Sequence, residues 1–491
     1  MLERSRFEQE RGRAPAARAP DLEEAVDAFW AHHRRYRTPP RRSVARLAQL
    51  ALSDDRELAA TGTRVLFERV IEPLCDGFTL LGANTYRRTF AQVICVARRL
   101  RRCEPLHRAL SLDGVRSERQ LLRRPEPAPL SRLKRSRVRH VLVLSRLTLG
   151  ADVAIALPVL QRMHALFPAA RIAFVGTDSA GVVAHSVSNV EHVRVPYGRT
   201  AFLAERLNVW SELRRAVRDV CEHLEPADYV VVDPDSRLTQ LGLLLPADAE
   251  RYFHFPSRSY AADGSDALSI LVGRWLDETF GACRAEPGLR ISREAAEWSR
   301  VLRARCADSC PLVSVSFGVG GNQRKRGGQD FETDLLEWLV RKGFRVLLAR
   351  GAGNLEVEES FRLGRRLAGR GVSVRHLPAG RSLDGLDGEA PQVVTWEADI
   401  ERFFAAIACA DAYVGYDSAG QHIAAALGVP TLSLFIESAG RRHALRWSPR
   451  GLGPVQVVRS PSPPDHAALL ERAKDAFDTL SRDMPSLTRS T

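Results

Sequence analysis

The sequence lacks a long apolar run and the common nucleotide-binding loops. No uncharged apolar stretch of about 18 residues or more occurs in the chain, so we expect no membrane-spanning helix. The polar first 20 residues hold no apolar segment of a signal peptide, which predicts a cytoplasmic protein. No G-x-x-x-x-G-K-[ST] or G-x-G-x-x-G motif lies at a strand-to-helix junction, which argues against an NTPase or a dehydrogenase.

The spacing of the eight cysteines predicts neither a disulfide framework nor a metal site. Thiols stay reduced in the cytosol, so we expect no disulfides. Cys306 and Cys310 are the only close pair, and no second Cys/His pair lies near them to complete a zinc site. We therefore expect structural thiols, no metal and no other cofactor.

The positive charge is concentrated in the first 140 residues. They contain 30 Lys and Arg against 17 Asp and Glu, a net charge of +13, whereas the remaining 351 residues hold 42 of each. This distribution favours contact with an anionic surface, such as a membrane or nucleic acid. The alternative is a general preference for Arg on solvated helices, which needs no partner.

The periodicity of the chain changes near residue 140. Apolar residues recur at helical spacing between Asp21 and Leu122, whereas apolar strands alternate with amphipathic helices after Val141. That alternation is typical of doubly wound α/β domains, and it restarts near residue 311. The predicted segments are a disordered tail (1–20), an α-helical extension (21–122), a basic Pro-rich linker (123–140), two Rossmann-like domains (141–300 and 301–482) and a tail (483–491).

Residues 410–435 carry the most informative pattern in the chain. A short strand over Ala412–Val414, a Gly-containing turn, a small-residue helix from Ser418 and a strand after Pro430 predict a βαβ unit of a parallel sheet. Asp417 and Ser418 lie where the helix begins and leaves backbone N–H groups free.

The start of this helix is a candidate anion site. The small residues Ala419 and Gly420 let a phosphate approach the free N–H groups and the positive end of the helix dipole. His422, four residues into the helix, could donate to the same anion. The plain alternative is that Asp417 and Ser418 only cap the helix and that His422 is a surface residue.

The stretch ADAYVGYDSAGQHIAAALGVPTLSLF resembles the C-terminal signature of glycosyltransferase family 9, the heptosyltransferases of lipopolysaccharide assembly. That signature runs ADxxVGxDSGxxHxAAALGxPTxxLF, and the chain departs from it at Ala419, where the family usually has Gly. The resemblance covers about residues 138–460. It implies the GT-B architecture, in which two Rossmann-like domains face a cleft, here preceded by the α-helical extension and without a metal.

The resemblance also implies a general base at Asp152. Family 9 proteins have a Ser-x-x-Gly-Asp element followed by Pro after six residues, and Asp152 keeps that spacing to Pro158 although Ala151 separates it from Gly150. A carboxylate near the acceptor hydroxyl can take its proton as the hydroxyl attacks the anomeric carbon. The alternative role is that of an acidic residue stabilised at a helix N-terminus.

The segment SFGVGGNQRKRGGQDF resembles the family pattern HPGAxxxxKRWPxxxF. The resemblance places Lys325 and Arg326 at the donor diphosphate, where a cation would neutralise the charge on the leaving group. Gly327 and Gly328 replace the Trp-Pro of the family, which predicts a looser loop.

Weaker matches to the family suggest residues that bind the ribose of the donor and residues that line the acceptor side. Glu356 or Glu358 would bind the ribose of the nucleotide, and the sequence leaves the choice open. Asp233 and Arg237 would line the acceptor side. A following loop on that side contains His254, Arg258 and Tyr260.

The resemblance to family 9 implies an inverting glycosyltransferase. It would move a sugar such as heptose from a nucleotide-diphosphate donor such as ADP-heptose to a glycan or glycolipid acceptor of the cell envelope. The predicted location is cytoplasmic, with peripheral contact of residues 1–140 at the inner face of the membrane. Other readings are a protein or small-metabolite acceptor, or a degenerate GT-B scaffold or sugar-nucleotide sensor whose basic extension docks on membrane or nucleic acid.

Overall fold

The structure is a computed structural model whose described residues form two compact units. The described residues are 19–123, 135–198, 201–225, 228–307, 310–320, 322–351, 353–377, 383–386, 390–397, 399–437 and 440–482. The predicted tail 483–491, most of the predicted tail 1–20 and most of the linker 123–140 lie outside them. The first unit groups residues up to 128 with 195–223 and 235–263, and the second contains the remaining segments.

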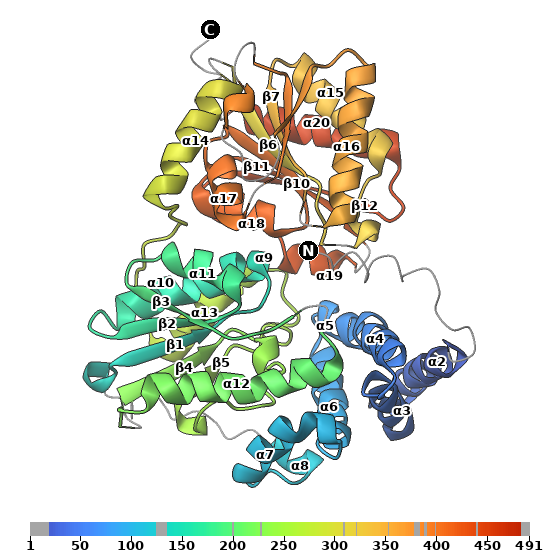
Figure 1. The fold of residues 1–491 in the computed structure, drawn as a ribbon, viewed down its shortest axis with the longest axis vertical. Helices are drawn as coiled ribbons and strands as arrows, with labels where there is room; N and C mark the ends of the chain where they lie inside the picture. Colours follow the sequence, from blue (N-terminus) through green and yellow to red (C-terminus); the bar gives the residue numbers. More distant parts are fainter. Residues whose placement is uncertain are drawn as a thin grey trace. The chain divides into compact units, whose positions relative to one another are not determined.

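The first unit is mainly α-helical, as the periodicity of residues 21–122 predicts. Its helices, blue to green in Figure 1, are α2 (Ala19–Tyr36), α3 (Arg41–Ala51), α4 (Arg56–Val65), α5 (Glu72–Asp76), α6 (Leu80–Ala97), α7 (Glu104–Leu112), α8 (Glu118–Leu122) and α12 (Leu203–Cys221). A π-helical stretch, Leu66–Ile71, joins α4 to α5, and the strand β5 (Tyr252–His254) also falls within this unit.

Helix α12 and the segment 235–263 group with the helical extension, which differs from the predicted boundary between residues 21–122 and 141–300. The backbone N–H of Leu203 donates to the Thr63 hydroxyl at 3.1 Å, and the Asn208 amide donates to the Arg102 carbonyl at 2.8 Å. These bonds join α12 to helices more than 100 residues earlier, and such pairings are not encoded in local periodicity.

The second unit begins with four parallel strands, β1 (His140–Leu144), β2 (Arg171–Gly176), β3 (Val190–Arg194) and β4 (Tyr229–Asp233). Strand β1 pairs with β2 on one side and with β4 on the other, and β2 pairs with β3. Its helices are α9 (Leu149–Ala151), α10 (Leu157–Leu166), α11 (Asp178–His185) and α13 (Leu268–Phe280).

A second, seven-stranded sheet follows in the order β12-β11-β10-β6-β7-β9-β8, and its neighbouring strands are parallel. Its strands are β6 (Leu312–Ser316), β7 (Arg345–Ala349), β8 (Val374–Leu377), β9 (Val393–Trp396), β10 (Ala412–Tyr416), β11 (Thr431–Glu437) and β12 (Val455–Pro461). Its helices are α14 (Arg293–Cys306), α15 (Gln329–Arg341), α16 (Asn354–Gly369), α17 (Ile400–Ala408), α18 (Ala419–Leu427), α19 (Arg441–Arg446) and α20 (His466–Ser481).

Helices cover both faces of this second sheet (Figure 1). Alternate strand residues face opposite sides, so Val313 and Val315 pack with α15, α16 and α20, whereas Leu312 and Leu347 pack with α14 and α17. The predicted βαβ unit is present, since β10, α18 and β11 follow one another. These parallel sheets with helices on both faces confirm the predicted α/β fold class.

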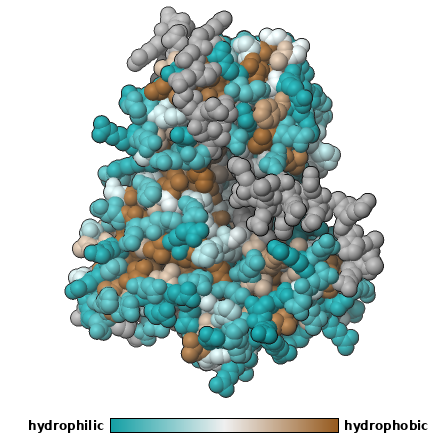
Figure 2. Space-filling model, in the orientation of Figure 1, coloured by the Kyte–Doolittle hydropathy of each residue, from teal (hydrophilic) through white to brown (hydrophobic). Residues whose placement is uncertain are grey.

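The surface drawn in Figure 2 is mostly hydrophilic, with hydrophobic side chains in small groups. Within the part of the chain that the structure describes, no helix combines the length and apolar character needed to cross a membrane.

Candidate functional site

The second sheet reverses its winding between β6 and β10. From β6 the chain continues to β7 on one side, whereas β10 lies on the other side and leads to β11. Gly415 of β10 pairs with Ser316 of β6, so the two strands end at the same edge. Ligands of open α/β sheets bind outside the carboxyl ends of the strands at such a switch point.

Asp417, directly after β10, joins the predicted donor residues into one cluster. Its side chain is 10% exposed and accepts a 2.5 Å hydrogen bond from the Lys325 ammonium of the loop after β6. The Gln421 amide donates to its other oxygen at 3.0 Å, and the His443 ring nitrogen Nε2 lies 3.3 Å from Oδ2. Two predicted residues 92 positions apart therefore form an ion pair at the switch point.

The charge of this pair is set by its surroundings. Burial alone would raise the pKa of Asp417, but the Lys325 ammonium and His443 together hold it well below its usual range. Asp417 is therefore ionised at neutral pH and holds Lys325 beside the first turn of α18. An arriving diphosphate would compete with this carboxylate for the ammonium.

The turn that starts α18 allows a ligand to approach the backbone closely. Ser418 is the N-cap residue, and its side chain makes no capping hydrogen bond to the helix. A side chain at Gly420 would overlap the hydroxyl of the buried Tyr413, so glycine is required at this position. The first N–H groups of α18 thus lie beside small residues, as the sequence predicts for an anion site.

His422 is buried and uncharged at neutral pH. Its side chain packs edge-on against Trp447, with ring centroids 6.0 Å apart. Burial lowers the pKa of His422 to about 4, although the Asp417 carboxylate opposes that shift. His422 can therefore offer an anion a neutral N–H donor but not a positive charge.

Arg326 points into the protein interior rather than offering an unpaired cation. It makes ion pairs with Glu332 and Glu359, and its Nε donates to Glu332 at 2.8 Å. Glu332 is fully buried and also accepts a 3.0 Å hydrogen bond from the Tyr416 hydroxyl. Through these ion pairs Arg326 fixes the loop that carries Lys325.

The loop is closely packed at Gly327, whereas the replacement of the family's Trp-Pro by Gly327 and Gly328 predicted a looser loop. A Cβ atom at Gly327 would lie 2.6 Å from the Phe331 ring, and its N–H donates to the Tyr416 hydroxyl at 2.8 Å. Gly328 has φ +94°, a conformation that favours glycine.

The two candidate ribose ligands differ in their positions on α16. Glu356 accepts hydrogen bonds from the backbone N–H groups of Val319 at 2.8 Å and Gly320 at 3.0 Å, both in the loop after β6. Glu358 is 61% exposed and forms an ion pair with Arg362 one turn along the helix. Glu356 is therefore the one that lies at the switch-point edge.

Asp152 lies at the carboxyl end of β1, where the first sheet also changes direction. It starts a π-helical stretch, Asp152–Ala156, a feature common at functional sites. Its oxygens accept hydrogen bonds from the Ser145 hydroxyl at 2.7 Å and from the Arg146 N–H at 2.6 Å. Burial raises the pKa of this fully buried carboxyl to about 7, although these hydrogen bonds oppose the shift. A carboxylate of that pKa suits general-base catalysis near neutral pH.

The loop before Asp152 contacts the first turn of α18. A Cβ atom at Gly150 would lie 3.0 Å from the Ala419 Cα, so the two backbones lie close together. The Arg146 guanidinium lies over the Trp447 ring, 5.9 Å from its centroid. The predicted base and the predicted diphosphate turn are thus held together within the second unit.

The candidate acceptor residues are divided between the two units. Asp233 ends β4 in the second unit and is fully buried. Arg237 belongs to the first unit, where it donates to the Tyr86 hydroxyl at 3.3 Å and contacts the Cys75 sulfur at 3.6 Å. Its guanidinium also lies 5.3 Å from the centroid of the Tyr86 ring.

The following loop in the first unit is organised by Asp235, a residue that sequence analysis missed. His254 lies 3.0 Å from one oxygen of Asp235, while Ser257 and Arg258 donate to the other at 2.6 and 2.8 Å. Asp235 adopts φ +73°, and its position one residue after Pro234 gives no sign of this cluster.

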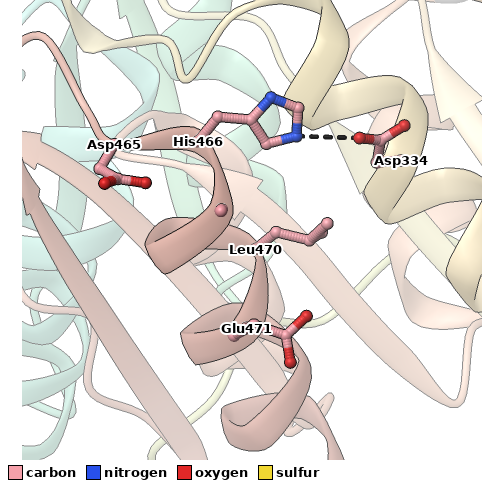
Figure 3. A pocket seen from close by; sticks show the side chains of 6 residues that line it. Asp334, Asp465, His466, Leu470 and Glu471 are labelled. Atoms are coloured by element: carbon pink, nitrogen blue, oxygen red, sulfur yellow. Dashed lines mark ion pairs between the residues drawn. The ribbon is translucent and has the colours of Figure 1, made fainter.

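A hollow of about 540 Å³ lies between α15 and α20 (Figure 3). His466 bonds to Asp334 at 2.9 Å across it, and Asp465 and Glu471 add further negative charge. It includes none of the predicted site residues, and its acidic lining disfavours a nucleotide diphosphate. Among the described residues, no group of three or more His, Cys, Asp or Glu side chains is placed to hold a metal ion.

Most of the site residues that sequence analysis missed form hydrogen bonds to the predicted residues or to the loops that carry them. Gln421 and His443 hold Asp417, whereas Tyr416 and Glu332 hold the loop of Lys325. The sequence did contain a signal for Glu332, which lies among the apolar residues of a core-facing helix. A charge buried in such a place needs a partner, so it predicts an ion pair.

Comparisons with known proteins agree with this arrangement. Residues 383–452 match the model of glycosyltransferase family 9 (heptosyltransferase). The crystal structure of a family 9 glycosyltransferase from Veillonella parvula is similar with a TM-score of 0.51 and 16% identity, covering 70% of this chain and 97% of that one. The ADP-heptose lipopolysaccharide heptosyltransferase II of E. coli has a TM-score of 0.46 and 15% identity, covering 72% of this chain and 100% of its own. No curated protein matches the sequence.

The family match includes Asp417, Ser418 and His422, and the Veillonella structure shares the fold. The predicted resemblance to family 9 and the predicted GT-B architecture are therefore confirmed.

Proposed function

We propose that this glycosyltransferase, with a family 9 signature on a GT-B fold, transfers a sugar such as heptose from a nucleotide-diphosphate donor to a glycan or glycolipid acceptor with inversion at the anomeric carbon. The observation that carries the proposal is the Lys325–Asp417 ion pair at the start of α18, beside the loop that holds Asp152. A cation and free helix N–H groups can stabilise the departing diphosphate, and a carboxylate can act as the general base that such a transfer needs.

The donor diphosphate would bind at the first turn of α18. Its negative charge would take the place of Asp417 as partner of the Lys325 ammonium, and the N–H groups beside Gly420 would donate to its oxygens. Glu356 would accept hydrogen bonds from the ribose hydroxyls at the same edge of the sheet, in exchange for the backbone N–H groups that it binds here.

The transfer itself would be a single displacement. The acceptor hydroxyl oxygen forms a bond to the anomeric carbon while its proton passes to the Asp152 carboxylate. The bond from the anomeric carbon to the diphosphate oxygen breaks, and its electron pair leaves with the nucleoside diphosphate. Lys325 and the dipole of α18 stabilise that charge, so the reaction needs no metal in this scheme.

The burial of Asp152 supports a second candidate function. Since both carboxylate oxygens accept hydrogen bonds, Asp152 also clamps the turn after β1, and this clamp is all that a non-catalytic protein would need. In that case the chain would be a sugar-nucleotide sensor that binds a donor without turning it over. The basic residues 1–140 would then supply contact with an anionic membrane or nucleic acid.

The first experiment is a titration of ADP-heptose, UDP-sugars and GDP-sugars by calorimetry. ADP-heptose comes first because the matched family is described as heptosyltransferases. Wild type, Asp152→Asn and the control Asp178→Asn, an exposed acidic residue paired with Arg194, would each be measured. Micromolar binding of one donor, kept in both variants, supports the donor site and identifies the nucleotide. No binding of any nucleotide sugar would contradict both candidate functions.

A further inference from the structure

A cavity of about 340 Å³ lies in the second unit, lined by none of the residues assigned to sugar transfer. Its walls come from the segment that starts α13, from the end of α19 and the residues after it, and from β12. Two arginines, Arg450 and Arg459, line it, together with Ser265, Asp266 and Ser448. The volume falls in the range of small-molecule sites, about 300–1,000 Å³.

Arg459 lacks an acceptor inside this cavity. It shares one face of β12 with Val455 and Val457, because alternate strand residues point the same way, and all three line the cavity. Its Nε is buried and makes no hydrogen bond, and no carboxylate within the described ranges pairs with its guanidinium. Among the described residues the terminal amino groups of Arg459 also make no hydrogen bond or ion pair, and the residue is half-buried, so these donors are available to an anion in the cavity.

The other charges in the lining add to this positive field. Arg450 is exposed at the rim and has no ion-pair partner in the described part of the chain. Asp266 is the one carboxylate of the lining, and its charge is neutralised by Arg274 at 2.6 Å. The Ser448 hydroxyl donates to the Ala444 carbonyl at 2.8 Å and can accept a hydrogen bond from a ligand.

The first turn of α13 also lines the cavity. Its N-cap residue is Ala267, which has no side-chain oxygen to accept from the first N–H groups of this 13-residue helix. The neighbouring Asp266 carbonyl is held by the buried Arg446 at 3.0 Å, which fixes the start of the helix against α19. The positive end of the helix dipole therefore reinforces the two guanidinium groups.

We propose that this cavity binds a phosphate group, either free phosphate or the phosphate of a small metabolite. Guanidinium groups match the geometry of phosphate oxygens, and the two arginines carry the two charges that a phosphate dianion needs. The bound phosphate would join α13 to β12 and α19, which come from the two sheet-containing halves of the unit. The site is independent of the proposed sugar transfer.

The test must separate this site from the donor site, which also binds phosphate oxygens. Lys325→Gln removes the donor-site cation, so calorimetric titrations use that background with inorganic phosphate and with glycerol phosphate as probes. We expect one phosphate per chain in Lys325→Gln and binding at least about tenfold weaker when Arg459→Gln is added. Arg472→Gln, an exposed arginine of α20, is the matched control and should leave the affinity unchanged.

Arg450→Gln provides a second variant whose exposed side chain carries no packing role, so a loss of affinity there cannot reflect misfolding. Tighter binding of glycerol phosphate than of phosphate would identify a phosphorylated metabolite as the ligand, and the reverse order would identify the free ion. Absence of millimolar phosphate binding in the Lys325→Gln background, or equal binding after Arg459→Gln and Arg450→Gln, would overturn the proposal. Donor turnover by wild type is measured separately, so neither outcome affects the proposed function.

Discussion

Lowering the pH should stop the proposed transfer through Asp152. Burial raises the pKa of this carboxyl from 3.8 to about 7, in spite of the hydrogen bonds from Ser145 and Arg146. Only the ionised carboxylate can accept the acceptor proton, so kcat/KM should fall about tenfold for each pH unit below 7. At pH 5 the expected value is about one hundredth of the plateau.

The same shift predicts a separate effect on folding. Between about pH 4 and 7 the native Asp152 holds a proton that the unfolded state has lost, so the unfolding free energy falls as the pH rises. One pKa unit corresponds to about 1.4 kcal/mol, and a shift from 3.8 to about 7 therefore costs about 4 kcal/mol above pH 7. Asp152→Asn lacks this cost, so its stability relative to wild type should rise across that window.

Two assays check this reasoning. Initial rates from pH 5 to 9 give the acid limb of kcat/KM, and urea unfolding at pH 4.5 and 7.5 gives the change in stability for wild type and Asp152→Asn. Asp178→Asn should leave both results unchanged, because that acid is 75% exposed and lies on α11. A rate that stays flat down to pH 5, or a stability difference that does not change with pH, would refute the reasoning.

Three further substitutions and one matched control test the donor side. Lys325→Gln should weaken nucleoside diphosphate binding roughly 10- to 100-fold in calorimetry, because a charge-assisted hydrogen bond contributes about 1.5–3 kcal/mol, and unchanged affinity would remove Lys325 from the site. Gly420→Ala should destabilise the protein by about 1–3 kcal/mol through overlap with Tyr413, seen as a lower Tm, and an unchanged Tm would contradict that packing. Glu356→Ala should cost about 1 kcal/mol, because the part-buried Val319 N–H loses its acceptor while the exposed Gly320 N–H can bond to water. The exposed Glu358→Ala should stay within about 0.5 kcal/mol in urea unfolding, and equal costs would refute the distinction.

Local pattern was sufficient to predict the βαβ unit around Asp417. The predicted strand over Ala412–Val414 is β10, which extends to Tyr416, and the helix expected from Ser418 is α18, with Ser418 as its N-cap. Apolar runs, small residues and a turn glycine encode these elements within about 25 residues, which is the range that sequence periodicity can report.

The partners of the site residues could not be predicted, because they depend on tertiary contacts. Lys325 and Asp417 are 92 residues apart, and only the parallel pairing of β6 with β10 brings them together. Arg326 looks in sequence like a second cation of the loop, yet Glu332 on the buried face of α15 takes its charge. The grouping of α12 with the helical extension likewise rests on contacts distant in sequence.

The measurement that tests the central claim most directly is the release of nucleoside diphosphate from the donor identified by titration, followed for wild type and Asp152→Asn at pH 8. The proposed transfer predicts slow turnover by wild type even without an acceptor, since water can replace the acceptor hydroxyl, and a loss of at least about 100-fold in the variant with its donor affinity kept. Equal turnover in both proteins would contradict the role of Asp152. Donor binding without any turnover by wild type, with or without glycan acceptors, would leave the sensor as the function.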